Sequence, residues 1–253
     1  MRDRTDAVAL ALGGVSDGPG GAGPAGLTLH DQARLVGGYQ WVERRLFEVL
    51  GAWVGSEPVP EAQVLYDVYS QQHAWHAELL AERLPVLDSL DPATLTVPPD
   101  AEVDRTLGLL AGTVSDQGAV GGEGAGGPGA PPRGTVPAGG TLLRLVGLGR
   151  VVLPRLVAGY NLHLRRLSSV ADAPVGRCLR LVRRDELEQW QAIEALTQSL
   201  LRRPHDIAVV TAHQQLLEEL LAGSGAGLVP WPEAPATPGP PADDPGPGSQ
   251  APA

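Results

Sequence analysis

Apolar side chains recur at helical spacing through the first half of the chain. The residues of the first stripe are spaced by three and four: Leu35, Tyr39, Val42, Leu46, Val49 and Trp53. A second stripe follows the break at residues 56–60 and ends before Pro85, and its members are Val64, Tyr66, Tyr69, His73, His76 and Leu80. The pattern predicts a helical hairpin over residues 28–84.

The same periodicity predicts further helices beyond residue 100. A short helix is expected near residues 100–111, and a long one from residue 141 that Pro154 kinks, because proline has no backbone N–H to donate. Another long helix begins at about Pro174, and a last one begins at Pro204 and ends at Gly223. Strand alternation is nowhere convincing, so we expect an all-α fold.

Glycine and proline divide the chain. There are 33 Gly and 24 Pro, and most of them lie in residues 1–26, 112–140 and 223–253, which hold few bulky apolar side chains. Such segments cannot repay the entropy of ordering, so we expect a disordered N-terminal tail, a disordered linker and a disordered C-terminal tail. The remaining residues of 27–222 are expected to form one helical bundle. Its long connection between two helical hairpins indicates a crossover along the bundle.

Composition excludes several classes of protein. The single cysteine, Cys178, allows neither an intramolecular disulfide nor a zinc site of four thiolates, and we expect it to be a small buried residue. The net charge of −10 argues against nucleic-acid binding. No run of 18 apolar residues is free of charge, and no signal peptide is evident, so we expect a cytoplasmic protein without a membrane span.

Positive charge is concentrated in residues 141–203, which hold eleven arginines against five acids. Arg177, Arg180 and Arg184 share one face of a predicted helix and are candidates for binding an anion such as phosphate. Alternatively, they pair with acids of the first hairpin. The charge asymmetry also favours the association of two copies into a homodimer.

Polar residues interrupt the apolar stripes at four positions. Glu43 lies beside the first stripe, and His73 and His76 are three residues apart and therefore share a face of the second helix. Glu186 lies on the predicted helix that begins at Pro174. Helical bundles that bind metals project such residues into their centre, so these four are the candidate ligands.

At these positions the chain resembles the ferritin-like superfamily. The resemblance rests on Tyr39-x-x-x-Glu43, on the HAEL segment that begins at His76, and on the DELEQ segment that begins at Asp185. It implies a four-helix bundle of two hairpins joined by a long crossover, here with a C-terminal helix added. A di-iron member of the family would activate oxygen, oxidise iron or hydroxylate a substrate, with Glu43, His76 and Glu186 as the first candidate ligands.

The chain departs from the family pattern at the ligand positions. His73 stands where the family carries Glu, and Gln189 where it carries His. The segment 141–170 contains no acid, and only Tyr160 and His163 occur near the expected ligand level. Two iron ions need several carboxylates to neutralise and bridge them, so the di-iron site is expected to be degenerate.

Apart from a position of one or both histidines at the rim of the bundle, two interpretations of the four polar residues remain open. In one, the histidines hydrogen-bond to Glu43, Glu186 or Tyr160 in a buried network without an ion. In the other, both histidines and one carboxylate bind a single zinc or non-haem iron ion. The first suggests a non-catalytic binding or structural module, and the second a non-haem iron oxidase or hydroxylase. A third function is regulatory, with the arginine stripe holding an acidic ligand; catalytic residues, substrate and protein partner stay unassigned.

Overall fold

The computed structural model describes residues 27–87, 90–112, 138–224 and 227–232, and most of these residues are helical. Within those ranges there is no strand, and one isolated antiparallel bridge joins Leu87 to Leu90. The prediction of an all-α fold is confirmed. No helix of the described part is long and apolar enough to cross a membrane.

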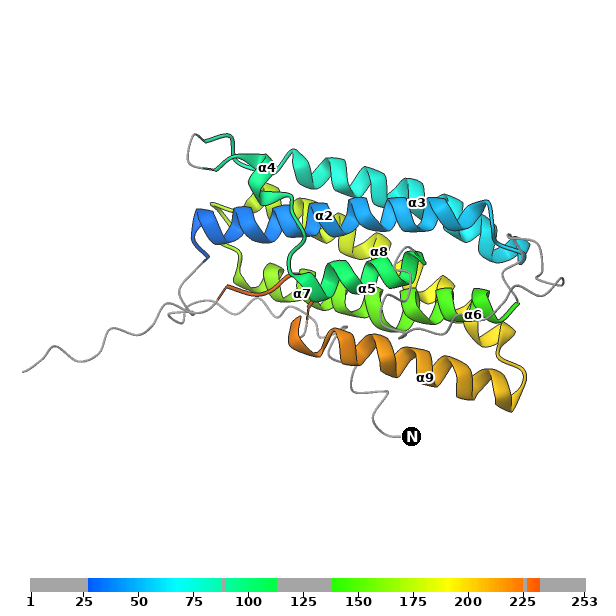
Figure 1. Ribbon diagram of the computed structural model, residues 1–253. Helices are drawn as coiled ribbons and strands as arrows, with labels where there is room; N and C mark the ends of the chain where they lie inside the picture. Colours follow the sequence, from blue (N-terminus) through cyan, green and yellow to red (C-terminus); the bar gives the residue numbers. More distant parts are fainter. Residues whose placement is uncertain (1–26, 88–89, 113–137, 225–226, 233–253) are drawn as a thin grey trace, which may run out of the picture.

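Helices α2 (Leu29–Val54) and α3 (Pro60–Ala81) form the predicted hairpin and lie side by side (Figure 1). A capping box starts α2, because the Thr28 hydroxyl accepts the N–H of Asp31 at 3.1 Å and the Asp31 carboxylate accepts the N–H of Thr28 at 3.2 Å. All six residues of the first predicted stripe are buried. The first stripe is therefore confirmed.

The second predicted stripe needs a correction at its first member, because Val64 is 62% exposed. A helix turns about 100° per residue, so Val64 points about 200° away from the fully buried Tyr66 and cannot share its face. Tyr69 is half-buried. The residues that α3 does bury are Ala62, Tyr66, Ser70, His73, His76, Ala77 and Leu80.

Two short helices follow α3, namely α4 (Pro92–Leu95) and α5 (Ala101–Ala111), and α5 is the helix expected near residues 100–111. The Asp100 carboxylate caps α5 by accepting the N–H of Val103 at 2.7 Å. Gly112 ends α5 with a φ of 72°, a left-handed conformation that glycine adopts without strain. Helix α5 packs on α2 and thereby carries the described part of the connection across the first hairpin.

The helix that contains Pro154 is divided into α6 (Ala138–Val146), the π-helical segment η1 (Gly147–Val152) and α7 (Leu153–Arg166). The N–H of Leu153 donates to the carbonyl of Leu148, five residues earlier, just before Pro154 enters the helix without a donor. A Cβ at Gly149 would lie 2.6 Å from the Ile193 side chain, so glycine allows the close approach of the next long helix.

That helix is α8 (Ala173–Leu200), and it contacts α3, α6 and α7. Helix α9 (Pro204–Leu220) begins at Pro204 as predicted and packs over α6 and η1 (Figure 1). The predicted end at Gly223 is wrong, because α9 is capped by Leu221 and Gly223 lies in the short η2 (Ala222–Ser224) that follows.

The folded part extends past two predicted boundaries. Helix α6 begins at Ala138, inside the segment that we expected to be a disordered linker up to residue 140. Leu228 and Val229 are buried and Trp231 packs against His163, inside the expected C-terminal tail. This part of the tail packs on the bundle because the burial of its apolar side chains in the core is favourable. The other parts of the expected tails and linker, at 1–26, 113–137 and 233–253, lie outside the described residues.

An acid of the first hairpin does pair with an arginine of the second half of the chain, but not with the predicted stripe. The Glu57 carboxylate accepts the Thr141 hydroxyl at 2.5 Å and Nη1 of Arg144 at 3.1 Å. The Arg144 guanidinium also lies 5.4 Å from the centre of a Trp53 ring. This contact fixes the turn between α2 and α3 against α6.

Candidate metal centre

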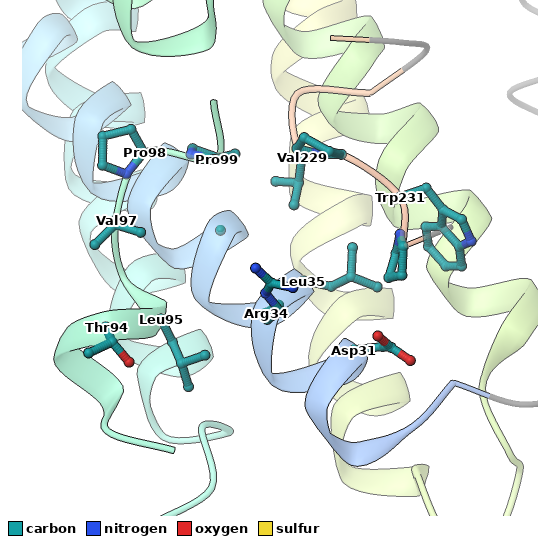
Figure 2. A pocket seen from close by; sticks show the side chains of 13 residues that line it. Asp31, Arg34, Leu35, Thr94, Leu95, Val97, Pro98, Pro99, Val229 and Trp231 are labelled. Carbon is teal, nitrogen blue, oxygen red and sulfur yellow. The ribbon is translucent and has the colours of Figure 1, made fainter. Parts of the chain in front are cut away.

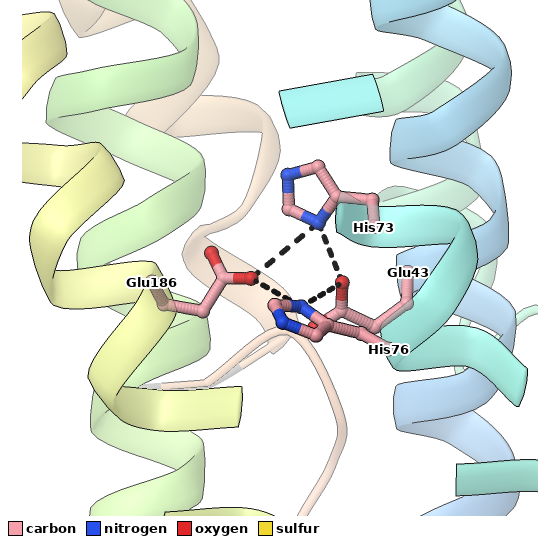
Figure 3. A group of neighbouring side chains, drawn as sticks. All are labelled: Glu43, His73, His76 and Glu186. Atoms are coloured by element: carbon pink, nitrogen blue, oxygen red, sulfur yellow. Dashed lines mark hydrogen bonds and ion pairs between the residues drawn. The ribbon is translucent and has the colours of Figure 1, made fainter. Parts of the chain in front are cut away.

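Four polar side chains from three helices meet in the core (Figure 3): Glu43 of α2, His73 and His76 of α3, and Glu186 of α8. Each of them is fully buried. One nitrogen or oxygen atom of each residue lies within 4.8 Å of the corresponding atom of every other. The four residues are the candidate ligands expected from the sequence, and the fold brings all of them together.

The distances place the two carboxylates between the two imidazoles. Nδ1 of His73 is 2.5 Å from Oε2 of Glu43 and 3.4 Å from Oε1 of Glu186. Nδ1 of His76 is 3.1 Å from the same oxygen of Glu186 and 3.4 Å from the same oxygen of Glu43. Both histidines therefore direct the same ring nitrogen at the same pair of oxygens.

Helical periodicity explains how each residue reaches this point. Glu43 lies four residues after Tyr39 and three before Leu46 on the buried face of α2. The spacing of three puts His73 and His76 one above the other on α3. Glu186 follows Val182 by four residues on the buried face of α8.

Two further residues hold the cluster from outside. Asp185 Oδ2 accepts a hydrogen bond from Nε2 of His76 at 3.2 Å, and the Tyr160 hydroxyl of α7 donates to Oε1 of Glu43. The sequence had indicated Tyr160 as a partner in a polar network, whereas the role of Asp185 was missed. The sequence feature that could have indicated Asp185 is its position beside Glu186 in an acidic segment that faces α3.

Gln189, which the resemblance to the ferritin-like superfamily placed at a histidine position, is not part of the cluster. Its amide nitrogen donates to the side-chain oxygen of Gln72 at 3.1 Å. His163 of α7 is not part of the cluster either. It packs against Tyr39 and Trp231, with ring centres 5.8 and 6.0 Å apart, and neither of its nitrogens has a partner among the described residues.

Burial and the neighbouring charges decide the protonation of the cluster. Burial alone would raise the pKa of Glu43, but the positive charges and hydrogen bonds of His73 and His76 outweigh it and lower that pKa. Burial would lower the pKa of both histidines, but the carboxylates of Glu43 and Glu186 raise it. Burial and the Glu43 carboxylate raise the pKa of Glu186. Without an ion, the histidines therefore hold protons that a metal would displace.

Burial and the Glu43 carboxylate also raise the pKa of Tyr160 well above its ordinary value. The phenol therefore stays protonated and acts as a hydrogen-bond donor to Glu43.

The atoms of the cluster lie near the spacing that one metal ion requires, but the side chains have to draw closer to bind it. The four donor atoms spread over as much as 4.8 Å, whereas two ligands of one ion are at most about 4.4 Å apart. Ligand bonds of about 2.0–2.2 Å place the ligands of a tetrahedral ion about 3.3–3.6 Å apart. Three of the four histidine–carboxylate distances are 3.1, 3.4 and 3.4 Å. The fourth, 2.5 Å between His73 and Glu43, is that of a hydrogen bond and has to lengthen when an ion replaces the proton. Two imidazoles and two carboxylates are donors that zinc and ferrous iron both accept.

Two surface cavities are lined by residues other than the four of the cluster. One of about 300 Å³ opens where α2 begins, between that helix, Pro98 and Pro99, and the segment with Val229 and Trp231 (Figure 2). Its acid, Asp31, already serves the cap of α2. The other is a groove that contains the predicted stripe of Arg177, Arg180 and Arg184.

Comparison of the chain with protein-family models, with curated proteins and with solved structures finds no match.

Proposed function

We propose that the chain is a ferritin-like helical bundle whose core binds one divalent transition-metal ion through Glu43, His73, His76 and Glu186. The observation that carries the proposal is the meeting of one donor atom from each residue within 4.8 Å, at full burial and from three helices. Burying four ionisable groups together costs desolvation free energy, and a metal ion offsets that cost because it bonds to all four of them.

The arrangement of the helices supports the ferritin-like part of the proposal. Helices α2 and α3 form one hairpin, and the chain from α6 to α7 forms a second hairpin with α8. A connection of more than 50 residues separates the hairpins, and ligands come from both. Metal sites of ferritin-like bundles are built in this way, from side chains of facing helices.

The donor set favours one ion over two. A pair of iron ions needs carboxylates from all sides to bridge and neutralise it. Helix α7 closes the cluster with the Tyr160 hydroxyl, which donates to Glu43, and the segment 141–170 has no acid. Two carboxylates compensate the charge of a single divalent ion, which leaves the core neutral once the histidines have lost their protons.

Full burial favours a binding or structural role for that ion. Structural zinc sites fill four positions with protein atoms, whereas catalytic sites keep a position open to water or substrate. All four side chains here have 0% exposure, and they link α2, α3 and α8. The ion therefore stabilises the packing of the two hairpins.

A non-haem iron oxidase or hydroxylase is the second candidate function, and the mixed set of two imidazoles and two carboxylates is the observation that favours it. Iron at this site would supply oxygen activation. His73, His76 and both glutamates would hold it, while Tyr160 would orient Glu43 and the apolar core would exclude water. Ferrous iron added in air is the test: an oxidase forms ferric iron faster than buffer does, and a structural site does not.

Metal analysis of the purified protein tests the site itself. We expect about one metal ion per chain after purification with zinc or ferrous iron, and less than about 0.1 in His73→Ala/His76→Ala. The matched control is His30→Ala/His205→Ala, which removes two exposed histidines and keeps the metal. Wild-type protein with less than about 0.1 ion per chain would refute the proposal, as would equal metal in both double variants.

A further inference from the structure

Four arginines surround one groove between α3 and α8, and they form what we call the arginine groove. Arg177, Arg180 and Arg184 lie on one face of α8, and Arg83 follows the end of α3 on the opposite side. The groove measures about 870 Å³, within the size range of pockets that bind small molecules. No aspartate or glutamate lines it, in a chain whose net charge is −10.

The guanidinium groups of this groove are weakly compensated. Arg177 and Arg180 make no ion pair or hydrogen bond with the described part of the chain. Arg83 and Arg184 pair only with Glu82 and Glu188, which are 66% and 64% exposed. Exposed pairs of this kind contribute little, so all four positive charges remain available to a ligand.

The groove also has an apolar and partly fixed wall. Leu79, Leu181 and Pro174 line it together with the half-buried Cys178, which the sequence had placed in the core. A Cβ at Gly176 would lie 3.4 Å from Nη1 of Arg180, so this guanidinium lies over the backbone of the first turns of α8. The groove thus combines cations with a surface for a hydrocarbon group.

We propose that the arginine groove binds a small organic phosphate, a phosphoryl group on an apolar body. A carboxylate brings one negative charge, which would leave three guanidiniums uncompensated. A phosphate monoester brings about 1.5 to 2 negative charges and three acceptor oxygens, which suit the bidentate donors of arginine. The apolar body would lie against Leu79, Leu181 and Pro174.

The groove lies close to the candidate metal centre along the same pair of helices. Arg83 is seven residues after His76 on one side, and Cys178 is eight residues before Glu186 on the other. At 1.5 Å per residue this offset is about 10–12 Å. Burial raises the pKa of the Cys178 thiol, and Arg83 and His76 both oppose that rise, in keeping with this proximity. The anion site is distinct from the metal ligands and does not depend on an ion being bound.

Isothermal titration of the full chain in about 50 mM salt tests the proposal, with phenyl phosphate and inorganic phosphate as probes. We expect phenyl phosphate to bind with a Kd below about 1 mM and inorganic phosphate to bind more weakly. Arg177→Ala/Arg180→Ala should weaken phenyl phosphate at least about tenfold, because it removes two charge-assisted contacts. Arg202→Ala/Arg203→Ala removes the same charge at the far end of α8, and there we expect less than a twofold change.

Three results would overturn the proposal. They are no binding of phenyl phosphate to the wild type up to about 10 mM, equal weakening in both double-arginine variants, and loss of binding in His73→Ala/His76→Ala with retention in Arg177→Ala/Arg180→Ala. The last result would place the probe on a metal ion. Circular dichroism of each variant confirms that the helices are intact, and Arg177→Lys/Arg180→Lys replaces the alanine variant if that one unfolds.

Discussion

Asp185 accepts a hydrogen bond from Nε2 of His76 at 3.2 Å, while Nδ1 of the same ring lies 3.1 Å from Glu186. The two contacts give the two ring nitrogens of His76 different roles. A proton held on Nε2 by Asp185 leaves the lone pair of Nδ1 for a metal once the ring is neutral. Asp185 is thus a positioning residue that selects the tautomer and aims the ring.

Replacing Asp185 should therefore weaken metal binding without removing a ligand. We expect Asp185→Ala to bind zinc about 10- to 100-fold more weakly than the wild type, the usual effect of losing an outer hydrogen-bond partner. Competition with a chromophoric chelator measures this affinity. Glu188→Ala, which removes a 64% exposed acid three residues away, should change it less than about twofold. An unchanged affinity in Asp185→Ala would refute the orienting role.

Two buried tyrosines give a matched test of the polar network. Tyr160 donates to Glu43, whereas the hydroxyl of Tyr66 has no partner among the described residues. Tyr160→Phe leaves a buried carboxylate oxygen without a donor and should cost about 1–3 kcal/mol of unfolding free energy. Tyr66→Phe removes an unpaired hydroxyl and should cost less than about 0.5 kcal/mol. Urea unfolding measures both, and equal losses would contradict the network.

Much of the fold follows from local sequence signals. The stripe of α2 predicts its buried face correctly, and Pro60, Pro174 and Pro204 mark the first turns of three helices. Val64 was wrongly assigned to the buried stripe of α3. It lies two residues before Tyr66, and a spacing of two puts side chains on nearly opposite faces of a helix, whereas spacings of three and four keep them on one face. Short apolar segments such as Leu228 and Val229 were missed, since composition over a whole tail hides two residues that can enter a core.

The sequence predicts which residues belong to the candidate site, but it does not predict how they are arranged in space. Charged or imidazole side chains on an apolar stripe indicate a buried cluster, and Glu43, His73, His76 and Glu186 were found in this way. Whether they meet depends on the register of α3 against α8, which is set by packing between distant segments. The contribution of Asp185 depends on that register as well.

His163 predicts a pH dependence of stability. Burial lowers its pKa to about 4, although Asp172 opposes the change, and the unfolded chain has an ordinary value of about 6.5. The unfolded state therefore binds more protons, and stability is lost as the pH falls from about 6.5 to 4. Between pH 7 and pH 5 the wild type should lose about 2 kcal/mol more than His163→Phe. Urea unfolding at both pH values measures this difference, and parallel losses would show that His163 is not buried as a neutral ring.

We propose that one ion lies between four side chains of three helices. Anomalous diffraction at the zinc absorption edge, from crystals of the protein purified with zinc, locates such an ion directly. We expect one peak in the core, bonded to Glu43, His73, His76 and Glu186 at about 2.0–2.2 Å. Two peaks about 3.5–4 Å apart would contradict the single ion, and the absence of any peak among these four residues would contradict the metal site itself.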